Sequence, residues 1–469
     1  MTKFLNTKNF LHKFLILELF EKLYRLKKYI NTCEKFDRKN NNDKIINLFM
    51  GSIELIGVEV DKLTLDINSD IDDNARFAYV LKISQNSKAI VKLHEELNSL
   101  HSSWILPEIK TFTKEIVNAD STVSDEVNVI LSDSYSFLES NLGKKFAKSL
   151  RDVYLKTEII ETFKENHSFI LPKIEFSNPL NWTIIVHEAG HLKSEIISSL
   201  RENADIIPDD IHTLDEARIK NWAEEIFCDI YAISLLGPAY FVSFITFALL
   251  STMDYGISSD SQMHPSVIIR ASIMMNYLQD NKLIFVSEWG VEDYCKIFYD
   301  CLFDQHTVFR DEPTKEIKGL TKFNRNLRKL IKELKLNNFS IDDTVSKRIK
   351  NLVENLQKGI PIGSVCDEKE IDIEPLLTRK DLEKEELDKF KVFVTERSCK
   401  LWEILNAGWI FKLENSCAEG ERIFFSKDSN DMTILDKINN YGAVVDFLDE
   451  RLLSSINTSQ IIKIIEDKK

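Results

Sequence analysis

Apolar residues recur every three or four positions over residues 10–31, with polar residues between them. This spacing predicts an amphipathic helix that packs its apolar face on another part of the protein. Residues 53–67 alternate in part between apolar and polar, which predicts one or two strands, and residues 75–83 predict another. A helix is expected at 87–100, and mostly helix over 126–162.

Asn178 and Pro179 follow a short apolar segment, 170–176, and mark the start of a helix. Asn is a preferred N-cap and Pro is favoured at the first helical position. Further helices are predicted at 215–236, 239–252, 265–278, 291–305, 389–410 and 444–467, and a short strand at 423–426. The pattern therefore predicts a mainly α protein with a minor β-sheet (α+β).

One apolar stretch is long enough to cross a bilayer, because no charged residue occurs between Ile230 and Met253. Gly237 and Pro238 interrupt it, and proline usually ends or kinks a helix. We therefore expect two helices buried in a large core and no membrane span. An integral membrane protein is the alternative, which detergent-free solubility on expression would exclude.

Composition narrows the class of protein. The chain has 469 residues and a net charge of -14, so it is not built to neutralise phosphates and no nucleic-acid partner is expected. Its seven cysteines are irregularly spaced and include no Cys-x-x-Cys pair, which is typical of a reduced intracellular protein. No signal peptide is recognisable. We expect a soluble, cytoplasmic protein.

Charge changes along the second half of the chain. Residues 314–350 hold eleven Lys/Arg against four Asp/Glu, and residues 367–388 hold ten acidic against four basic residues. We interpret these runs as a solvated helical arm and a linker. The prediction is an N-terminal α+β domain, a catalytic core, the charged arm and linker, and a C-terminal helical domain, at residues 1–165, 166–310, 311–375 and 376–469.

Residues 187–191 read His-Glu-Ala-Gly-His. His187 and His191 lie one turn apart on the same face of a helix, so both imidazoles can reach one tetrahedral Zn²⁺. Glu188 projects toward the metal-activated water, where it can act as general base. Gly190 allows a neighbouring element to approach closely. The motif predicts a zinc site.

A third protein ligand is needed if zinc is to keep one position open for water. Glu225 and Asp229 are at i and i+4 in an apolar context, so both can face the metal. Glu225 would complete the site, and Asp229 would hold the free N–H of a ligating His. Glu224 is the alternative ligand. Cys228 is a conceivable ligand, but its helical angle places it off the Glu225/Asp229 face.

A third motif is His264-Pro265, followed by Arg270. A His at a helix start beside a zinc site could donate a hydrogen bond to the oxyanion of a tetrahedral intermediate, although a His before Pro often serves only as a cap. Arg270 could pair with Asp229 or Glu224, or bind a substrate carboxylate.

In this order the three motifs resemble the gluzincin metallopeptidases of the type found in the CAAX prenyl protease and the heat-shock membrane protease. The resemblance covers about residues 178–275. It implies that His187, His191 and Glu225 bind zinc, that Glu188 is the catalytic base and that His264 assists the transition state.

The chain departs from that family in two ways. It lacks clear transmembrane helices beside the motifs, and Cys228 stands where Ala is usual, so the membrane setting and prenylated substrates are not carried over. Glu225 followed by the Leu-Leu-Gly-Pro sequence at 235–238 also resembles the cytosolic metallopeptidases that cleave phage-type repressors, which lack the His-Pro motif.

The expected function is an intracellular zinc endopeptidase that acts on a protein or peptide substrate. The alternative is a metal-bound scaffold or regulatory protein that binds a partner without turnover. Glu188 argues against the scaffold, because a structural metal site has no use for a base.

Overall fold

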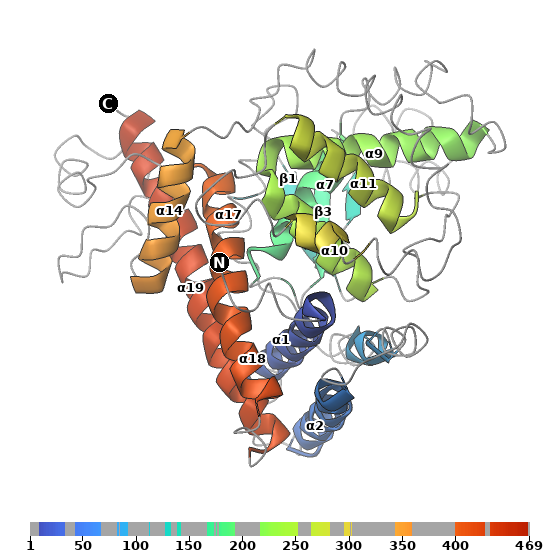
Figure 1. Cartoon of the computed structure of the whole chain (residues 1–469), viewed down its shortest axis with the longest axis vertical. Helices are drawn as coiled ribbons and strands as arrows, with labels where there is room; N and C mark the ends of the chain where they lie inside the picture. Colours follow the sequence, from blue (N-terminus) through green and yellow to red (C-terminus); the bar gives the residue numbers. More distant parts are fainter. Residues whose placement is uncertain are drawn as a thin grey trace, which may run out of the picture.

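The computed structural model describes only part of the chain. The described residues are 9–32, 43–66, 82–83, 85–91, 112, 127–132, 138–141, 167–172, 175, 178–192, 216–251, 264–281, 295–300, 302, 343–358, 399–426 and 432–467. This part is mainly α-helical, as predicted (Figure 1).

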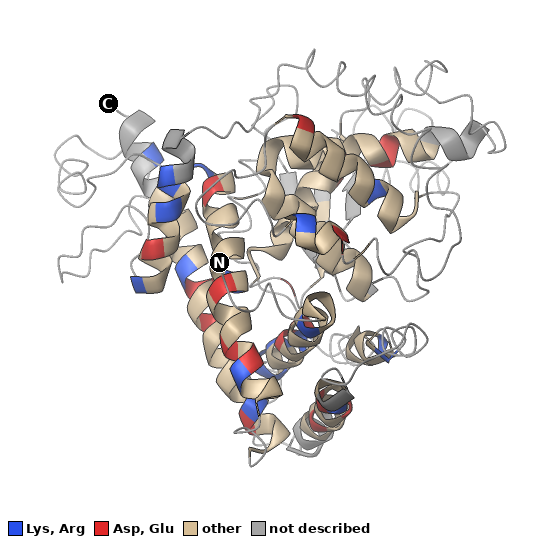
Figure 2. Cartoon of the chain, in the orientation of Figure 1, with Lys and Arg blue, Asp and Glu red and all other residues tan. Residues whose placement is uncertain are grey.

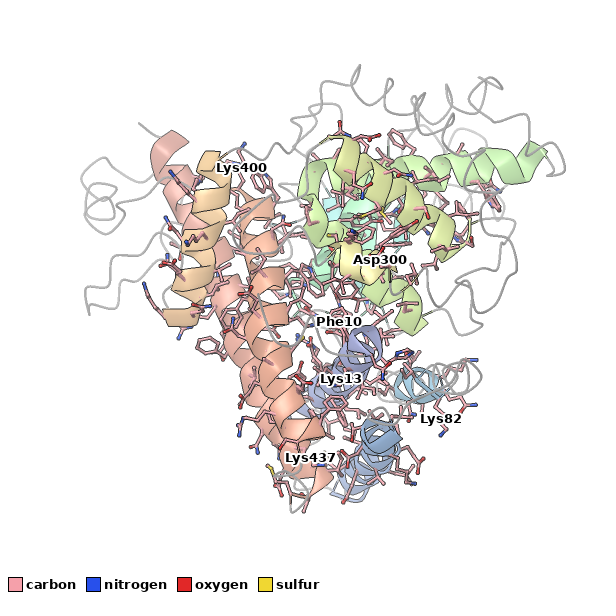
Figure 3. All side chains as sticks on the ribbon, viewed as in Figure 1. Phe10, Lys13, Lys82, Asp300, Lys400 and Lys437 are labelled. Atoms are coloured by element: carbon pink, nitrogen blue, oxygen red, sulfur yellow. The ribbon has the colours of Figure 1, made fainter. Side chains whose placement is uncertain are left out.

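The N-terminal helix α1 (Phe10–Thr32) forms where the three-to-four-residue pattern predicts it. Its apolar side chains are buried, and it packs against the second helix and against helices from the C-terminal end of the chain (Figure 1). Phe10 lies where α1 meets the body of the molecule, and its ring contacts Phe298 edge-on with centroids 5.1 Å apart (Figure 3).

The second helix, α2 (Asp43–Asp66), overturns the prediction of strands at 53–67. Ile53, Ile56, Val60 and Leu63 are buried and follow a helical spacing, which the partial alternation of the same sequence concealed. Residues 82–83 and 85–91 are also helical, whereas the remainder of the predicted strand at 75–83 and helix at 87–100 lies outside the described residues.

A three-stranded sheet has the order β1-β3-β2. The strands are β1 (Val127–Ser132), β2 (Leu138–Asn141) and β3 (His167–Pro172). The central strand β3 runs parallel to β1 and antiparallel to β2. The prediction of helix over 126–162 is therefore wrong at β1 and β2, and its other residues lie outside the described part.

The middle of the described part of the chain carries the helices that surround the motif. They are η2 (Asn181–Thr183), α7 (Ile184–Gly190), α9 (Glu216–Leu236), α10 (Pro238–Ser251) and α11 (Val267–Asp280). Gly237, with φ of 61°, separates α9 from α10, so the uncharged stretch forms two buried helices as predicted. Among the described residues, no helix is long and apolar enough to cross a membrane.

The C-terminal part is a set of packed helices (Figure 1). They are α14 (Asp343–Lys358), α17 (Leu401–Phe411), the π-helix η5 (Lys412–Ser416), α18 (Cys417–Phe425) and α19 (Ile434–Asp467). The strand predicted at 423–426 is wrong, because Ile423 and Phe424 are buried on the helical face of α18. The predicted helix at 389–410 begins at Leu401 in the described part.

Buried apolar side chains form one continuous core from α1 to α19. Helix α14, from the predicted charged arm, packs on α17. Charged side chains gather on the helices at the N- and C-terminal ends, whereas α10 carries none (Figure 2). The division into four domains stays a prediction.

Candidate metal centre

The segment that leads into α7 is fixed by one buried carboxylate. Glu175 accepts hydrogen bonds from the side-chain amides of Asn178 and Asn181, at 3.0 Å and 2.8 Å, and pairs with Lys22 of α1. Asn178 thus binds Glu175 and does not cap the helix as the sequence predicted. The chain turns through η2 before the α-helix begins at Ile184.

Helices α7 and α9 approach closely at Gly190. A Cβ atom on Gly190 would lie 2.9 Å from Cα of Cys228, so any larger residue would push the helices apart. This confirms the expectation that Gly190 permits a close approach. The contact places the His face of α7 directly on the carboxylate face of α9.

Each imidazole of the motif is held by a carboxylate at Nδ1. His187 Nδ1 lies 3.0 Å from Oδ1 of Asp229, and His191 Nδ1 lies 3.0 Å from Oε1 of Glu224. A carboxylate on Nδ1 fixes the orientation of the ring and makes Nε2 the metal-binding atom. The predicted role of Asp229 as a partner of a ligating His is consistent with this contact. Glu224 fills the same position for the second His.

Both Nε2 atoms point to Glu225. His187 Nε2 is 3.3 Å from Oε2 of Glu225, and His191 Nε2 is 3.7 Å from Oε1. Ligand atoms on the edges of a tetrahedral zinc site are separated by about 3.4 Å, given bond lengths of about 2.0–2.2 Å. The two imidazoles approach different oxygens of Glu225, so the carboxylate would have to turn before one of its oxygens could bind a zinc ion together with both Nε2 atoms. Glu225 faces both Nε2 atoms, whereas Glu224 contacts Nδ1 of His191. Among the described residues, Glu225 does not belong to the group whose ligand atoms all lie within 4.8 Å of one another.

The electrostatics of the site favour a cation. Burial opposes a charge on His187, but hydrogen bonds to Asp229 and Glu225 outweigh it and raise the pKa of His187 to about 10. Burial likewise opposes ionisation of Glu225, but hydrogen bonds from His187 and His264 hold its pKa well below the usual value. A metal that binds here must displace a proton, because a His ligand is neutral.

Arg270 and Tyr240 complete the surroundings of Asp229. Arg270 donates to both Asp229 oxygens at 2.6 Å and 2.7 Å, which is one of the pairings considered from the sequence. Despite burial, the charge of Arg270 holds the pKa of Asp229 at about 2. Tyr240 donates to Asp229 at 2.7 Å and lies 3.2 Å from His187 Nδ1. No sequence spacing relates Tyr240 on α10 to the motif, so the sequence alone does not indicate this contact.

His264 lies at the exposed edge of the same site. Its Nδ1 is 3.0 Å from Oε2 of Glu225, while its side chain is 56% exposed. The residue therefore lies beside Glu225 in the His187 site, at the boundary with solvent. Glu188 follows His187 on α7 and is half-buried.

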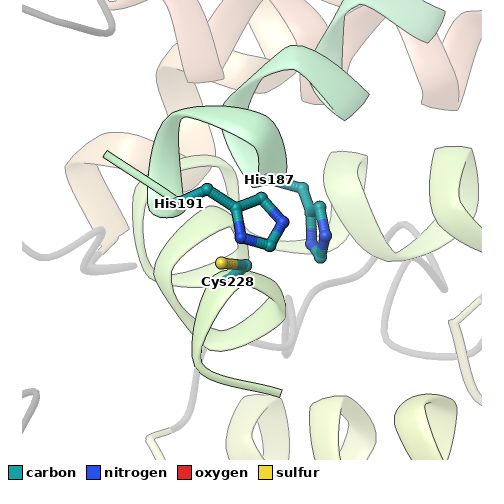
Figure 4. A group of neighbouring side chains, drawn as sticks. All are labelled: His187, His191 and Cys228. Carbon is teal, nitrogen blue, oxygen red and sulfur yellow. The ribbon is translucent and has the colours of Figure 1, made fainter. Parts of the chain in front are cut away.

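Cys228 is closer to the imidazoles than the sequence predicted. Its Sγ and one nitrogen from each of His187 and His191 lie within 4.8 Å of one another (Figure 4). Glu225 and Cys228 are at i and i+3 on α9, so they share a face. Cys228 is therefore near enough to both imidazoles to be considered as a metal ligand beside Glu225.

No protein-family model, curated protein or solved structure matches this chain. The case for a function rests on the motif and its geometry.

Proposed function

We propose that the chain is a zinc-dependent peptidase with a zincin-like core, whose metal is held by His187, His191 and Glu225. The carrying observation is that two imidazoles, each held at Nδ1 by its own carboxylate, direct Nε2 to opposite oxygens of Glu225. Three protein ligands leave one position open, which distinguishes catalytic from structural zinc sites.

Zinc, when bound, would polarise the scissile carbonyl and activate water. Glu188 would take the proton from that water and return it to the leaving amine. His264 would donate a hydrogen bond to the developing oxyanion from the exposed edge of the site. Asp229, Glu224, Arg270 and Tyr240 keep the two ligating imidazoles in place and do not touch the substrate.

The open edge of the site supports a protein or peptide as the substrate. His264 is more than half exposed and His191 is 22% exposed, so the site can be reached from solvent. We propose a cytoplasmic endopeptidase, because the irregular spacing of its seven cysteines is typical of a reduced intracellular protein. The resemblance to gluzincins and the one to repressor-cleaving metallopeptidases support the same chemistry and leave the substrate open.

A structural metal site is the second candidate function, and the position of Cys228 favours it. A fourth protein ligand would leave no position for water, as in structural zinc sites. In that case the chain would be a metal-bound scaffold for a partner, and Glu188 would have no catalytic role.

The test separates metal binding from turnover. Glu188→Gln should keep one zinc per chain and lose cleavage, measured by comparing new N-termini in a proteome treated with wild type and variant. Glu59→Gln, a matched change at an exposed position of α2, is the control and should cleave as wild type. Identical sets of N-termini from wild type and Glu188→Gln, with zinc bound in both, would leave the scaffold as the function.

A further inference from the structure

The metal centre holds one more potential ligand than the proposed peptidase needs. Cys228 is 0% exposed, and within the described part of the chain its thiol forms no hydrogen bond. A buried thiol that packs only as a small apolar group would be unremarkable in a core. Here, however, it is placed with the nitrogen atoms of His187 and His191, with the three ligand atoms within 4.8 Å of one another (Figure 4).

The close contact of α7 and α9 accounts for this position. A Cβ on Gly190 would lie 3.0 Å from Sγ of Cys228, so only glycine lets the thiol sit against the turn that carries His191. Zinc binds thiolate at about 2.3 Å and imidazole at about 2.0–2.1 Å, so a small movement of Sγ would bring it into the coordination sphere.

We propose that Cys228 is a fourth protein ligand that closes the metal site in the resting protein, and that it must leave the metal before a substrate can bind. This inference rests on the proposed function, because it assigns the regulation of the same site. Ligation would be an exchange: the S–H bond of Cys228 would break with release of its proton to solvent, the thiolate would bind the metal, and the water in the fourth position would leave. With Cys228 bound, the site has the four ligands of a structural site. With Cys228 displaced, it has the three ligands of a catalytic one.

Cobalt substitution reads the sulfur ligand directly and independently of activity. Apoprotein of the full chain loaded with one Co²⁺ should show both the visible d–d bands of bound cobalt and a near-ultraviolet thiolate-to-cobalt charge-transfer band. Zinc-edge X-ray absorption of the zinc-loaded chain should show one sulfur scatterer at about 2.3 Å. In Cys228→Ala, both sulfur signatures should disappear while the d–d bands remain.

Cys417→Ala is the matched control, because Cys417 is equally buried on α18 and lies among other charged groups. It should keep both signatures. Wild-type protein that shows d–d bands but no charge-transfer band would overturn the proposal, and this measurement does not depend on how the variants fold.

Peptide cleavage then separates this inference from the peptidase itself. We expect several-fold faster cleavage by Cys228→Ala than by wild type, dependent on Glu188 in both. A thiolate-to-cobalt band without cleavage by either protein would make Cys228 a ligand of a structural site. That result would contradict the proposed peptidase function. Cleavage that depends on Glu188, without the thiolate-to-cobalt band, would support the peptidase function. It would contradict the proposal that Cys228 is a ligand.

Discussion

In the part of the chain that the structure describes, two groups of buried charged side chains can be compared, and they differ in their access to solvent. The His187 site consists of His187, His191, Glu224, Glu225, Asp229 and Arg270. The Lys412 cluster consists of Glu18, Glu21, Arg25, Lys412 and Asp449. Lys412 Nζ lies 2.5 Å from Glu18 and 2.9 Å from Glu21, and Arg25 joins Glu21 to Asp449.

Every side chain of the Lys412 cluster is 7% exposed or less. In the His187 site, by contrast, the side chain of His191 is 22% exposed, and the exposed His264 contacts Glu225. The basic residues of the Lys412 cluster are Lys and Arg, which keep their protons. They can therefore only neutralise the carboxylates of the same cluster. The open site uses imidazoles, which can release a proton and bind a metal in its place. The kind of basic residue and the access to solvent thus distinguish the proposed metal site from a cluster that only holds helices together.

The largest expected effect is loss of metal from the His187 site. His187→Ala should lower zinc from one per chain to none, because it removes one of the two imidazoles of the site and the ring that Asp229 orients. Metal analysis after dialysis checks this. His264→Ala should keep its zinc, since His264 contacts Glu225 without being a predicted ligand. Full zinc retention by His187→Ala would show that the metal is held elsewhere.

Removing a cation from the Lys412 cluster should instead lower the free energy of unfolding. Lys412→Met leaves Glu18 and Glu21 buried without their shared cation, and such a loss typically costs about 3–5 kcal/mol in the free energy of unfolding. Urea unfolding of the metal-free protein measures it.

Lys437→Met is the matched control for this loss. Lys437 pairs with the partly exposed Asp61, so its loss should cost about 1 kcal/mol or less. Equal destabilisation by the two variants would mean that burial does not distinguish these ion pairs.

The two regions also differ in how far the sequence could predict them. His187, His191, Glu225 and Asp229 sit at helical spacings within two short segments, so local geometry was enough to group them. The Lys412 cluster joins residues about 400 positions apart, and no local pattern reports such a contact. The same limit applies to β1, whose parallel pairing with β3 depends on a partner 40 residues away.

The strand prediction in α2 was wrong because its sequence fits both the two-residue period of a strand and the period of a helix. In α2, residues 58–67 alternate enough to suggest a strand, but the buried positions from Ile53 to Leu63 follow the helical period. The helix leaves Leu55 and Val58 exposed, at 67% and 41%. Burial against α1 and α19, which the sequence does not show, decided between the two patterns.

A smaller effect concerns the pH dependence of stability. Burial raises the pKa of Glu18 from 4.5 to about 7, and the charge of Lys412 only partly opposes it. Between pH 4.5 and 7 the folded protein therefore binds more protons at Glu18 than the unfolded chain does, so this group's contribution to stability falls as the pH rises. The slope is at most about 1.4 kcal/mol per pH unit.

Urea unfolding at pH 5, 6 and 7 should show that Glu18→Gln weakens this dependence. Asp449, with its pKa raised by burial to about 6, acts in the same direction and should leave a residual slope. An unchanged slope in Glu18→Gln would assign the pH dependence to other groups.

The smallest effects are expected from removing the hydroxyl groups of two buried tyrosines, Tyr240 near the His187 site and Tyr441 near the Lys412 cluster. Tyr240→Phe removes the hydroxyl that bridges Asp229 and His187, so the orientation of His187 is less well fixed and zinc affinity should fall by about tenfold. Within the described part of the chain, the Tyr441 hydroxyl near the Lys412 cluster is buried without a hydrogen-bond partner. Tyr441→Phe should therefore leave zinc affinity unchanged and alter stability by about 1 kcal/mol or less, in the stabilising direction. Competition with a chelator measures the affinity and urea unfolding the stability. If both variants bind zinc as wild type does, Tyr240 only packs, and Asp229 alone orients His187.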